Sequence, residues 1–179
     1  MLLLEKAWAK LYGSYQRIEA GTTGEALPAL TGAPTEYILH REAKSNTNAL
    51  WKKILQADKN KYVIATAASS AQSGKERAEM KRVGLVDAHA YSLISAMELS
   101  YGVSKVKLLK IRNPWGFKEW NGDWSDNSDK WTEDLKRQAK FVKADDGIFH
   151  ISFDDYLEHF YITTICKAAE THHLSIKAD

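Results

Sequence analysis

The densest β-strand signal in the chain lies in residues 88–113, which read AHAYSLISAMELSYGVSKVKLLKIRN. Small, β-branched and aliphatic side chains predominate on both sides of Ser100-Tyr101-Gly102, a triplet typical of turns. The pattern therefore predicts a β-hairpin. With its turn centred on Tyr101, antiparallel pairing places His89 opposite Asn113 at the open end of the hairpin, on one face of the sheet.

The predicted pairing of a histidine with an asparagine has two interpretations. An imidazole whose ring nitrogen is held by an amide oxygen is a base of fixed tautomer, which is what a cysteine nucleophile needs beside it. An isolated histidine in a strand is more often a structural residue with satisfied ring nitrogens. The hairpin geometry alone leaves both interpretations of His89 open.

Hydrophobic periodicity and turn-forming residues predict the elements around the hairpin. Helices are expected over Leu3 to Leu11, around Leu50 to Leu55, over Thr132 to Lys140 and from Ser152 to Phe160. Strands are expected over Tyr62 to Thr66, Ile148 to Ser152 and Tyr161 to Cys166. Loops are expected at 21–34, at 69–81 on the surface, and at 115–131, where tryptophans should hold an ordered conformation.

Composition limits the classes of partner. The 179 residues include 25 Lys and Arg against 23 Asp and Glu, and this net charge of +2 without a basic cluster argues against nucleic-acid binding. The longest uncharged stretch, Tyr62 to Gly74, has 13 residues and is too short for a membrane span, which needs about 18. A single cysteine cannot form an internal disulfide, which points to a reducing, cytoplasmic environment.

Two sequence blocks carry a family resemblance: Gly84-Leu85-Val86-Asp87-Ala88-His89-Ala90-Tyr91-Ser92 and Ile111-Arg112-Asn113-Pro114-Trp115-Gly116. At this separation they resemble the calpain family of intracellular, calcium-dependent cysteine proteases, and supporting matches extend over residues 2–167. In that family the papain-like catalytic domain has two subdomains, the first with the cysteine and the second with the histidine and asparagine. The resemblance implies an α+β fold, a twisted antiparallel β-sheet with flanking helices, which is the β-rich half of a papain-like cysteine protease.

The resemblance also implies a division of the chain. Residues 1–12 are expected to be the closing helix of the preceding subdomain, residues 13–167 the second calpain-type subdomain, and residues 168–179 a loose C-terminal tail. The amphipathic helix at the start of the chain then packs on the missing cysteine-bearing subdomain. Judged without the family, an ordinary first helix folded back on its own domain explains the pattern about as well.

By the same resemblance, His89 is the general base and ion-pair partner of the thiolate, and Asn113 orients it. Trp115 is expected to shield the His–Asn hydrogen bond from water, since a thiolate–imidazolium pair persists only where solvent does not exchange with it. The remaining cysteine, Cys166, follows the histidine in an apolar strand and is interpreted as a buried structural thiol. The chain by itself is therefore expected not to hydrolyse peptides.

Calcium is the cofactor that the resemblance implies. The matching ligands are the carboxylates of Glu119, Asp126 and Asp146 and the backbone carbonyl of Ala144, which are hard oxygen donors. Ile148 departs from the family pattern, because a further glutamate is usual there, and the site is expected to be weak or empty. Judged without the family, these acids are solvated loop charges.

A second departure precedes the histidine, where Asp87-Ala88 replaces the usual small glycine and narrows the cleft wall. The favoured function is the His/Asn-bearing half of a calpain-type endopeptidase that performs limited proteolysis of protein substrates, with the cysteine-bearing subdomain as its partner. The alternative is a non-enzymatic, calcium-responsive or peptide-binding scaffold. A third hypothesis, sugar binding by the tryptophan-rich segment 115–131 (the tryptophan loop), has less support.

Overall fold

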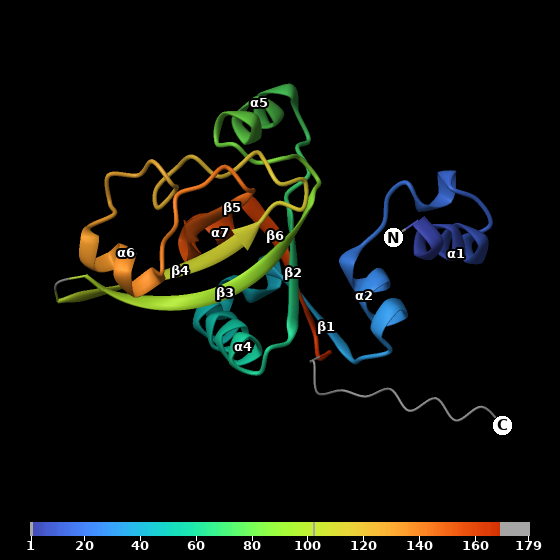
Figure 1. Ribbon diagram of the computed structural model, residues 1–179, viewed down its shortest axis with the longest axis horizontal. Coiled ribbons are helices and arrows are strands. Elements are labelled where there is room, and N and C mark those ends of the chain that lie inside the picture. Colours follow the sequence, from blue (N-terminus) through green and yellow to red (C-terminus); the bar gives the residue numbers. More distant parts are fainter. Residues whose placement is uncertain (1, 102, 169–179) are drawn as a thin grey trace.

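The computed structural model describes residues 2–101 and 103–168, and its centre is a six-stranded antiparallel sheet (Figure 1). The strand order is β1-β6-β2-β3-β4-β5. The strands are β1 (Thr35–Leu39), β2 (Val63–Ala68), β3 (Ala90–Tyr101), β4 (Ser104–Arg112), β5 (Ile148–Ser152) and β6 (Phe160–Cys166). The helices are α1 (Leu2–Tyr12), η1 (Gln16–Ile18), α2 (Thr23–Thr31), α3 (His40–Ala43), η2 (Lys44–Asn46), α4 (Thr47–Lys59), α5 (Gly74–Arg82), α6 (Glu133–Ala139) and α7 (Phe153–His159). The expected α+β fold is confirmed.

Helices cover both faces of the sheet, and the alternation of side chains along β4 separates two cores. Leu109 and Ile111 point into the larger core, which α4 and α7 cover with Trp51, Ile54 and other apolar side chains. Leu108 points to the opposite face and joins a smaller core beneath α6 and the tryptophan loop. The strands therefore carry apolar residues on both faces, as their sequence indicates.

The predicted hairpin is present, but its register differs from the prediction. Tyr101 pairs with Ser104, so the turn lies one residue or more beyond the predicted centre. A bulge between Leu93 and Ser95 then shifts the register by one residue back toward the predicted one. The pair nearest the open end is Ser92 with Arg112, so His89 and Asn113 are not directly opposed. The misplaced turn centre therefore caused the wrong partner for His89, and the bulge, which leaves no single-residue signature in the sequence, offsets one residue of that error.

The predicted loop at 21–34 contains a helix, α2, and this prediction was wrong. The Thr22 hydroxyl accepts a hydrogen bond from the Glu25 N–H, which caps the helix start, and Gly32 ends it with a φ of +67°. A Cβ on Gly24 would lie 1.5 Å from the Tyr37 ring, so glycine lets α2 approach β1 closely. Tertiary packing here outweighs the low helix propensity of glycine and proline.

The predicted surface loop at 69–81 was also wrong in its second half, which forms α5. The Ser73 hydroxyl accepts from the Glu76 N–H, and the Glu76 carboxylate accepts from the Gln72 N–H, a variant of the capping box. Only Met80 of this helix is buried. The helix is thus specified mainly by its capping residues, which a search for hydrophobic periodicity misses.

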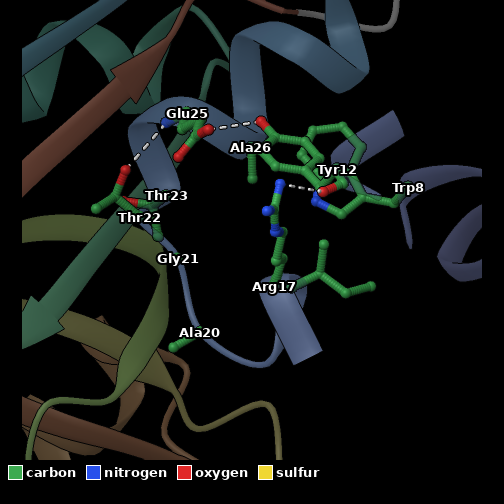
Figure 2. A pocket seen from close by; sticks show the side chains of 10 residues that line it. Trp8, Tyr12, Arg17, Ala20, Gly21, Thr22, Thr23, Glu25 and Ala26 are labelled. Carbon is green, nitrogen blue, oxygen red and sulfur yellow. Dashed lines mark hydrogen bonds between the residues drawn. The ribbon is translucent and has the colours of Figure 1, made fainter. Parts of the chain in front are cut away.

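The predicted N-terminal helix is confirmed, and Leu3, Leu4 and Leu11 face solvent, whereas Ala9 is buried. Leu3 is 84% exposed and Leu11 is 73% exposed, and Figure 1 shows α1 at the edge of the molecule, away from the sheet. Tyr12 donates a hydrogen bond to Glu25, and Arg17 donates to the Tyr12 carbonyl, so that α1, η1 and α2 enclose a small pocket (Figure 2). The Tyr12–Glu25 hydrogen bond and a small apolar contact that buries Ala9 attach α1 to its neighbours.

The other predicted helices and strands are confirmed with end shifts of a few residues, and residues 115–131 are the expected irregular loop. The predicted loose tail falls almost entirely at 169–179, outside the described residues. No helix in the described ranges combines the length and apolar character that crossing a bilayer requires.

Candidate active site

The candidate site lies where the β3–β4 hairpin opens. His89 directly precedes β3 and Asn113 directly follows β4, and the distance from His89 Nε2 to Asn113 Oδ1 is 3.0 Å. Asn113 is fully buried, whereas His89 is partly exposed. The structure therefore brings the two sequence-predicted residues together, through the ends of the strands instead of through direct cross-strand pairing.

The surroundings of Asn113 fix which end of its amide faces the histidine. Its Nδ2 donates to the carbonyls of Phe117 at 2.8 Å and Lys118 at 3.0 Å, while its Oδ1 accepts from the Trp115 N–H at 3.1 Å. Because only the amide nitrogen can donate to carbonyls, Oδ1 must face His89. His89 Nε2 then carries the proton, and Nδ1 is the unprotonated nitrogen of the neutral ring.

Aromatic rings pack on the His89 imidazole. The ring centroids of His89 and Trp115 are 4.4 Å apart, and those of His89 and Tyr91 are 5.0 Å apart in an edge-on arrangement. Trp115 is 49% exposed and carries the Lys118 ammonium 5.1 Å above its ring. Trp115 thus occupies the place beside the His–Asn pair that the sequence predicted.

The cysteine of this chain lies far from that pair. Cys166 is fully buried, and the Thr31 hydroxyl lies 3.3 Å from its Sγ. It pairs with Val63 at the start of β2, whereas Ala68 at the end of β2 donates a hydrogen bond to the His89 carbonyl. Five residues of strand span about 16 Å. Cys166 is therefore a structural thiol, as predicted, and does not meet His89.

The tryptophan loop is held by its own indoles, as predicted. Trp120 Nε1 donates to the Asp123 carbonyl at 2.8 Å, and Trp131 Nε1 donates to the Ser125 carbonyl at 2.9 Å. Trp124 packs edge-on against Trp131 with centroids 5.2 Å apart. These three rings are buried, so they hold the loop and are not available as a binding surface for a sugar.

Three of the four residues predicted to bind calcium, Glu119, Asp126 and Ala144, line one small cavity beside this loop. They share it with Asn127, Lys143 and Asp145. Burial is the main cause that raises the pKa of both carboxyls, and the Asp126 charge adds to the effect on Glu119. One oxygen, Asp126 Oδ1, is buried without a hydrogen-bond partner among the described residues.

Asp146 and Ala144, which were also predicted to bind calcium, already make other hydrogen bonds. The Asp146 carboxylate accepts from the Ile148 N–H at 2.9 Å, and it is the neighbouring Asp145 that lines the cavity. The Ala144 N–H donates to Asp126 Oδ2 at 3.1 Å. Within residues 2–101 and 103–168, no three His, Cys, Asp or Glu side chains are placed to hold a metal ion together.

Backbone contacts connect the two regions. Glu119 Oε1 accepts from the N–H groups of Asp146 at 3.0 Å and Gly147 at 2.7 Å, and the Gly147 carbonyl accepts from the Asn113 N–H at 2.8 Å. A Cβ on Gly147 would lie 2.7 Å from the Asn113 carbonyl oxygen, and its φ is +82°. Only glycine therefore fits this junction.

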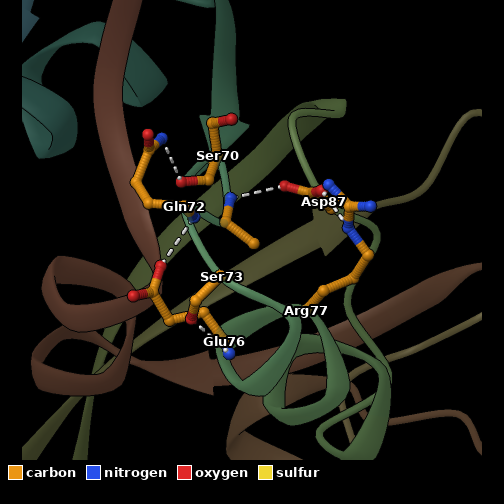
Figure 3. A network of polar contacts seen from close by, with 7 residues as sticks. Ser70, Gln72, Ser73, Glu76, Arg77 and Asp87 are labelled. Carbon is orange, nitrogen blue, oxygen red and sulfur yellow. Dashed lines mark hydrogen bonds and ion pairs between the residues drawn. The ribbon is translucent and has the colours of Figure 1, made fainter.

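Asp87, two residues before His89, has a structural role that the sequence does not indicate. Asp87 accepts a hydrogen bond from the Ala71 N–H and forms an ion pair with Arg77 (Figure 3). Ala71 is 16 residues away in the sequence, and no spacing rule predicts such a contact.

Comparison with known proteins gives a consistent result. A family profile described as "Calpain family cysteine protease" matches residues 1–167. Human calpain-14 is 39% identical over 168 residues, which are 92% of this chain and 23% of that protein. Mouse calpain-12 is 40% identical over 169 residues, 92% of this chain and 22% of that protein. The maize calpain-type cysteine protease DEK1 is 35% identical over 171 residues, 92% of this chain and 8% of that protein.

The fold, the His–Asn pair and these matches together define the class of protein. The chain belongs to the calpain family of cysteine proteases. It spans less than a quarter of the length of these three relatives.

Proposed function

We propose that this chain is the His/Asn-bearing half of a calpain-type cysteine endopeptidase, which supplies the general base and its orienting amide for limited proteolysis of protein substrates. The observation that carries the proposal is the His89–Asn113 hydrogen bond of 3.0 Å with a single allowed orientation of the amide. That orientation leaves His89 Nδ1 as the nitrogen that takes a proton from a thiol.

The roles of the individual residues follow from their contacts. Once His89 is protonated, the Asn113 oxygen continues to accept from Nε2, so the imidazolium keeps its position beside the thiolate. Trp115 covers one side of the ring and reduces exchange of the His–Asn bond with water. His89 can later return the proton to the leaving amine.

The proposal requires a cysteine on another polypeptide segment, because Cys166 is buried on β6. We assign residues 1–12 to the end of the cysteine-bearing subdomain, residues 13–167 to the second subdomain and residues 168–179 to a tail. The exposed leucines of α1 support this division, since they form an apolar surface that a preceding subdomain would cover. Reliance on a thiolate fits a reducing, cytoplasmic location.

The first test is the activity of the chain by itself. The purified 179-residue chain is expected to fold and to show no cleavage of casein, with or without calcium, because base and nucleophile must lie within hydrogen-bond reach. Addition of a cysteine-bearing calpain subdomain that associates with it is expected to give turnover. Cleavage by the chain alone that stops when Cys166 is alkylated would contradict the proposal.

A scaffold function is the second candidate, favoured by the burial of the single thiol in this chain. The residue at the nucleophile position of the proposed partner subdomain distinguishes the protease function from the scaffold function. A cysteine there supports the protease, whereas serine, lysine or glycine there leaves peptide or calcium binding as the function.

Calcium binding in the tryptophan loop is the finer part of the proposal. The buried, unpartnered Asp126 Oδ1 and the neighbouring Glu119 carboxylate fit the oxygen donors that calcium prefers. A bound ion would supply the positive charge that these two carboxylates lack. The Lys143 ammonium already provides part of this positive charge, because it lowers the pKa of Asp126. Burial raises the same pKa and has the larger effect. The Asp146 carboxylate would have to leave the Ile148 N–H to join the site.

These features predict weak binding that tryptophan fluorescence detects. Because Glu119 and Asp126 flank Trp120 and Trp124, calcium is expected to change the emission with a Kd of about 10⁻⁴ to 10⁻³ M. The measurement is a calcium titration with magnesium as the ion control and Asp126→Asn as the matched variant. A flat trace to several millimolar would show that this chain has lost the site while leaving the His–Asn proposal intact.

A further inference from the structure

The residue before His89 has a backbone conformation that its side chain disfavours. Ala88 has a φ of +48°, in the left-handed region, and its side chain is exposed. For an L residue other than glycine, this region is about tenfold or more less populated than the right-handed one. Such a conformation persists only where the surrounding contacts impose it. Since the Ala88 methyl packs into no core, the contacts must come from its neighbours.

Two anchors flank Ala88, and both attach to the segment 68–71. On one side, Asp87 Oδ1 accepts from the Ala71 N–H at 2.7 Å. A dashed line from the backbone between Ser70 and Gln72 to the Asp87 carboxylate in Figure 3 marks this bond. On the other side, the His89 carbonyl accepts from the Ala68 N–H at 2.9 Å. The Ala88 N–H itself reaches the Ser69 carbonyl only at 3.4 Å. With both ends of the peptide fixed, the backbone at Ala88 has little freedom to relax.

The two contacts of the Asp87 carboxylate differ in importance. Its ion pair with Arg77 has an N–O distance of 3.1 Å, but the Arg77 side chain is 70% exposed, so solvent weakens the attraction. The bond from the Ala71 N–H is shorter and belongs to a partly buried part of the loop. Hydrogen bonds from backbone N–H groups to a carboxylate are stronger than neutral ones. The Ala71 contact is therefore the main anchor.

We propose that Asp87 is a positioning residue for His89. By holding the Ala71 N–H, it keeps Ala88 in the left-handed conformation and thereby directs the His89 imidazole toward Asn113 and Trp115. This inference rests on the proposed function of His89 as the base. It also accounts for an alanine where the family usually has glycine, because the Asp87 anchor supplies the constraint that makes the left-handed conformation accessible to alanine.

A double-variant comparison isolates this role. In Asp87→Ala, the fraction of molecules with His89 packed on Trp115 is expected to fall about tenfold, because Ala88 is no longer constrained and leaves the left-handed region. In Asp87→Ala/Ala88→Gly, this fraction is expected to return to within about threefold of the parent, because glycine adopts this region freely. Asp87→Asn keeps an oxygen for the Ala71 N–H, and Arg77→Ala removes only the exposed pair, so both are expected to resemble the parent.

The primary readout needs no catalysis. Nuclear magnetic resonance of the 179-residue chain measures the His89–Trp115 ring contact and the protonated nitrogen of His89, and hydrogen exchange measures protection of the Ala71 amide. A parent-like ring contact in Asp87→Ala would overturn the inference. Equal loss in Asp87→Ala and in the double variant would also overturn it, since Asp87 would then support the fold without acting through Ala88.

Turnover supplies the second readout, in the enzyme reconstituted with a cysteine-bearing subdomain. Asp87→Ala is expected to lower kcat about tenfold with little change in KM, and Ala88→Gly is expected to restore it. An unchanged kcat in Asp87→Ala, or no rescue, would contradict the positioning role. An inactive parent reconstitution would count against the proposed protease function alone, because the ring-contact measurement is independent of it.

Discussion

Replacing His89 with alanine is expected to lower kcat of the reconstituted enzyme by about 10⁴-fold or more, because the cysteine loses its base and its ion-pair partner together. The measurement is the initial rate on a fluorogenic peptide, with complex formation verified by size-exclusion chromatography. The chain should still fold, since His89 is partly exposed and makes one side-chain hydrogen bond among the described residues.

Asn113→Ala provides the comparison. A loss of kcat about 10 to 100 times smaller than that of His89→Ala is expected, because Asn113 orients the base without receiving the proton. Its stability cost should be larger, about 2 to 4 kcal/mol, since the Trp115 N–H and two backbone carbonyls lose their partner. Equal and mild losses of turnover for the two variants would contradict the assigned roles.

Acidification from pH 6.5 to pH 4 is expected to destabilise the chain through two buried histidines. Burial lowers the pKa of His40 to about 4, and burial together with the nearby Lys110 lowers that of His150 to about 4, against an ordinary value of 6.5. Between these values the unfolded chain binds protons that the folded chain does not, so stability falls as pH falls. Each histidine contributes on the order of 3 kcal/mol, most of which is lost by pH 4 and the remainder below it.

The two histidines differ in how they tolerate burial, which supplies a control. His40 donates from Nδ1 to the Phe160 carbonyl at 2.7 Å and accepts at Nε2 from the Thr163 hydroxyl at 2.8 Å. His150 lies against Trp131 and Phe141, and neither of its ring nitrogens has a partner among the described residues. His150→Leu should therefore stabilise the fold at neutral pH as well as remove its share of the acid sensitivity.

Urea unfolding measured at several pH values between 4 and 8 tests this prediction. His159→Gln is the matched control, because it removes an imidazole from a partly exposed position at the end of α7. The same pH slope in His150→Leu as in the parent would mean that another group causes the acid sensitivity.

The sequence predicted the elements whose hydrophobic period is clear and missed those specified by local polar contacts. The strands from β2 to β6 carry dense apolar residues, and their positions follow from composition. α2 and α5 depend on the capping residues Thr22 and Ser73, and α2 also on the close approach of Gly24 to β1. Rules of thumb for glycine and proline therefore gave loops where packing and caps produce helices.

In the candidate site too, short motifs could be predicted from the sequence, whereas contacts between distant loops could not. The His–Asn pair was predicted from two short motifs and the hairpin, although the misplaced turn made the inferred register wrong, an error that the bulge in β3 reduces by one residue. The contacts of Asp87 with Ala71, and of Glu119 with Gly147, join residues 16 and 28 positions apart in different loops. Only the folded chain brings such pairs together, so no periodicity in the sequence reports them.

The contact between Glu119 and Gly147 has a consequence for how cation and substrate affect each other. The carboxylate proposed to bind calcium also accepts from the Gly147 N–H, and Gly147 accepts from the N–H of Asn113. An ion that draws the Glu119 carboxylate away from the Gly147 N–H would disturb Gly147, whose carbonyl binds the backbone of Asn113. The side chain of Asn113 is the group proposed to orient His89. Thermodynamic linkage then makes the effect reciprocal: whatever factor calcium adds to peptide affinity, a bound peptide adds to calcium affinity. If the proposed calcium ion raises peptide affinity, calcium affinity measured without peptide will be lower than that of the peptide-bound protein by the same factor.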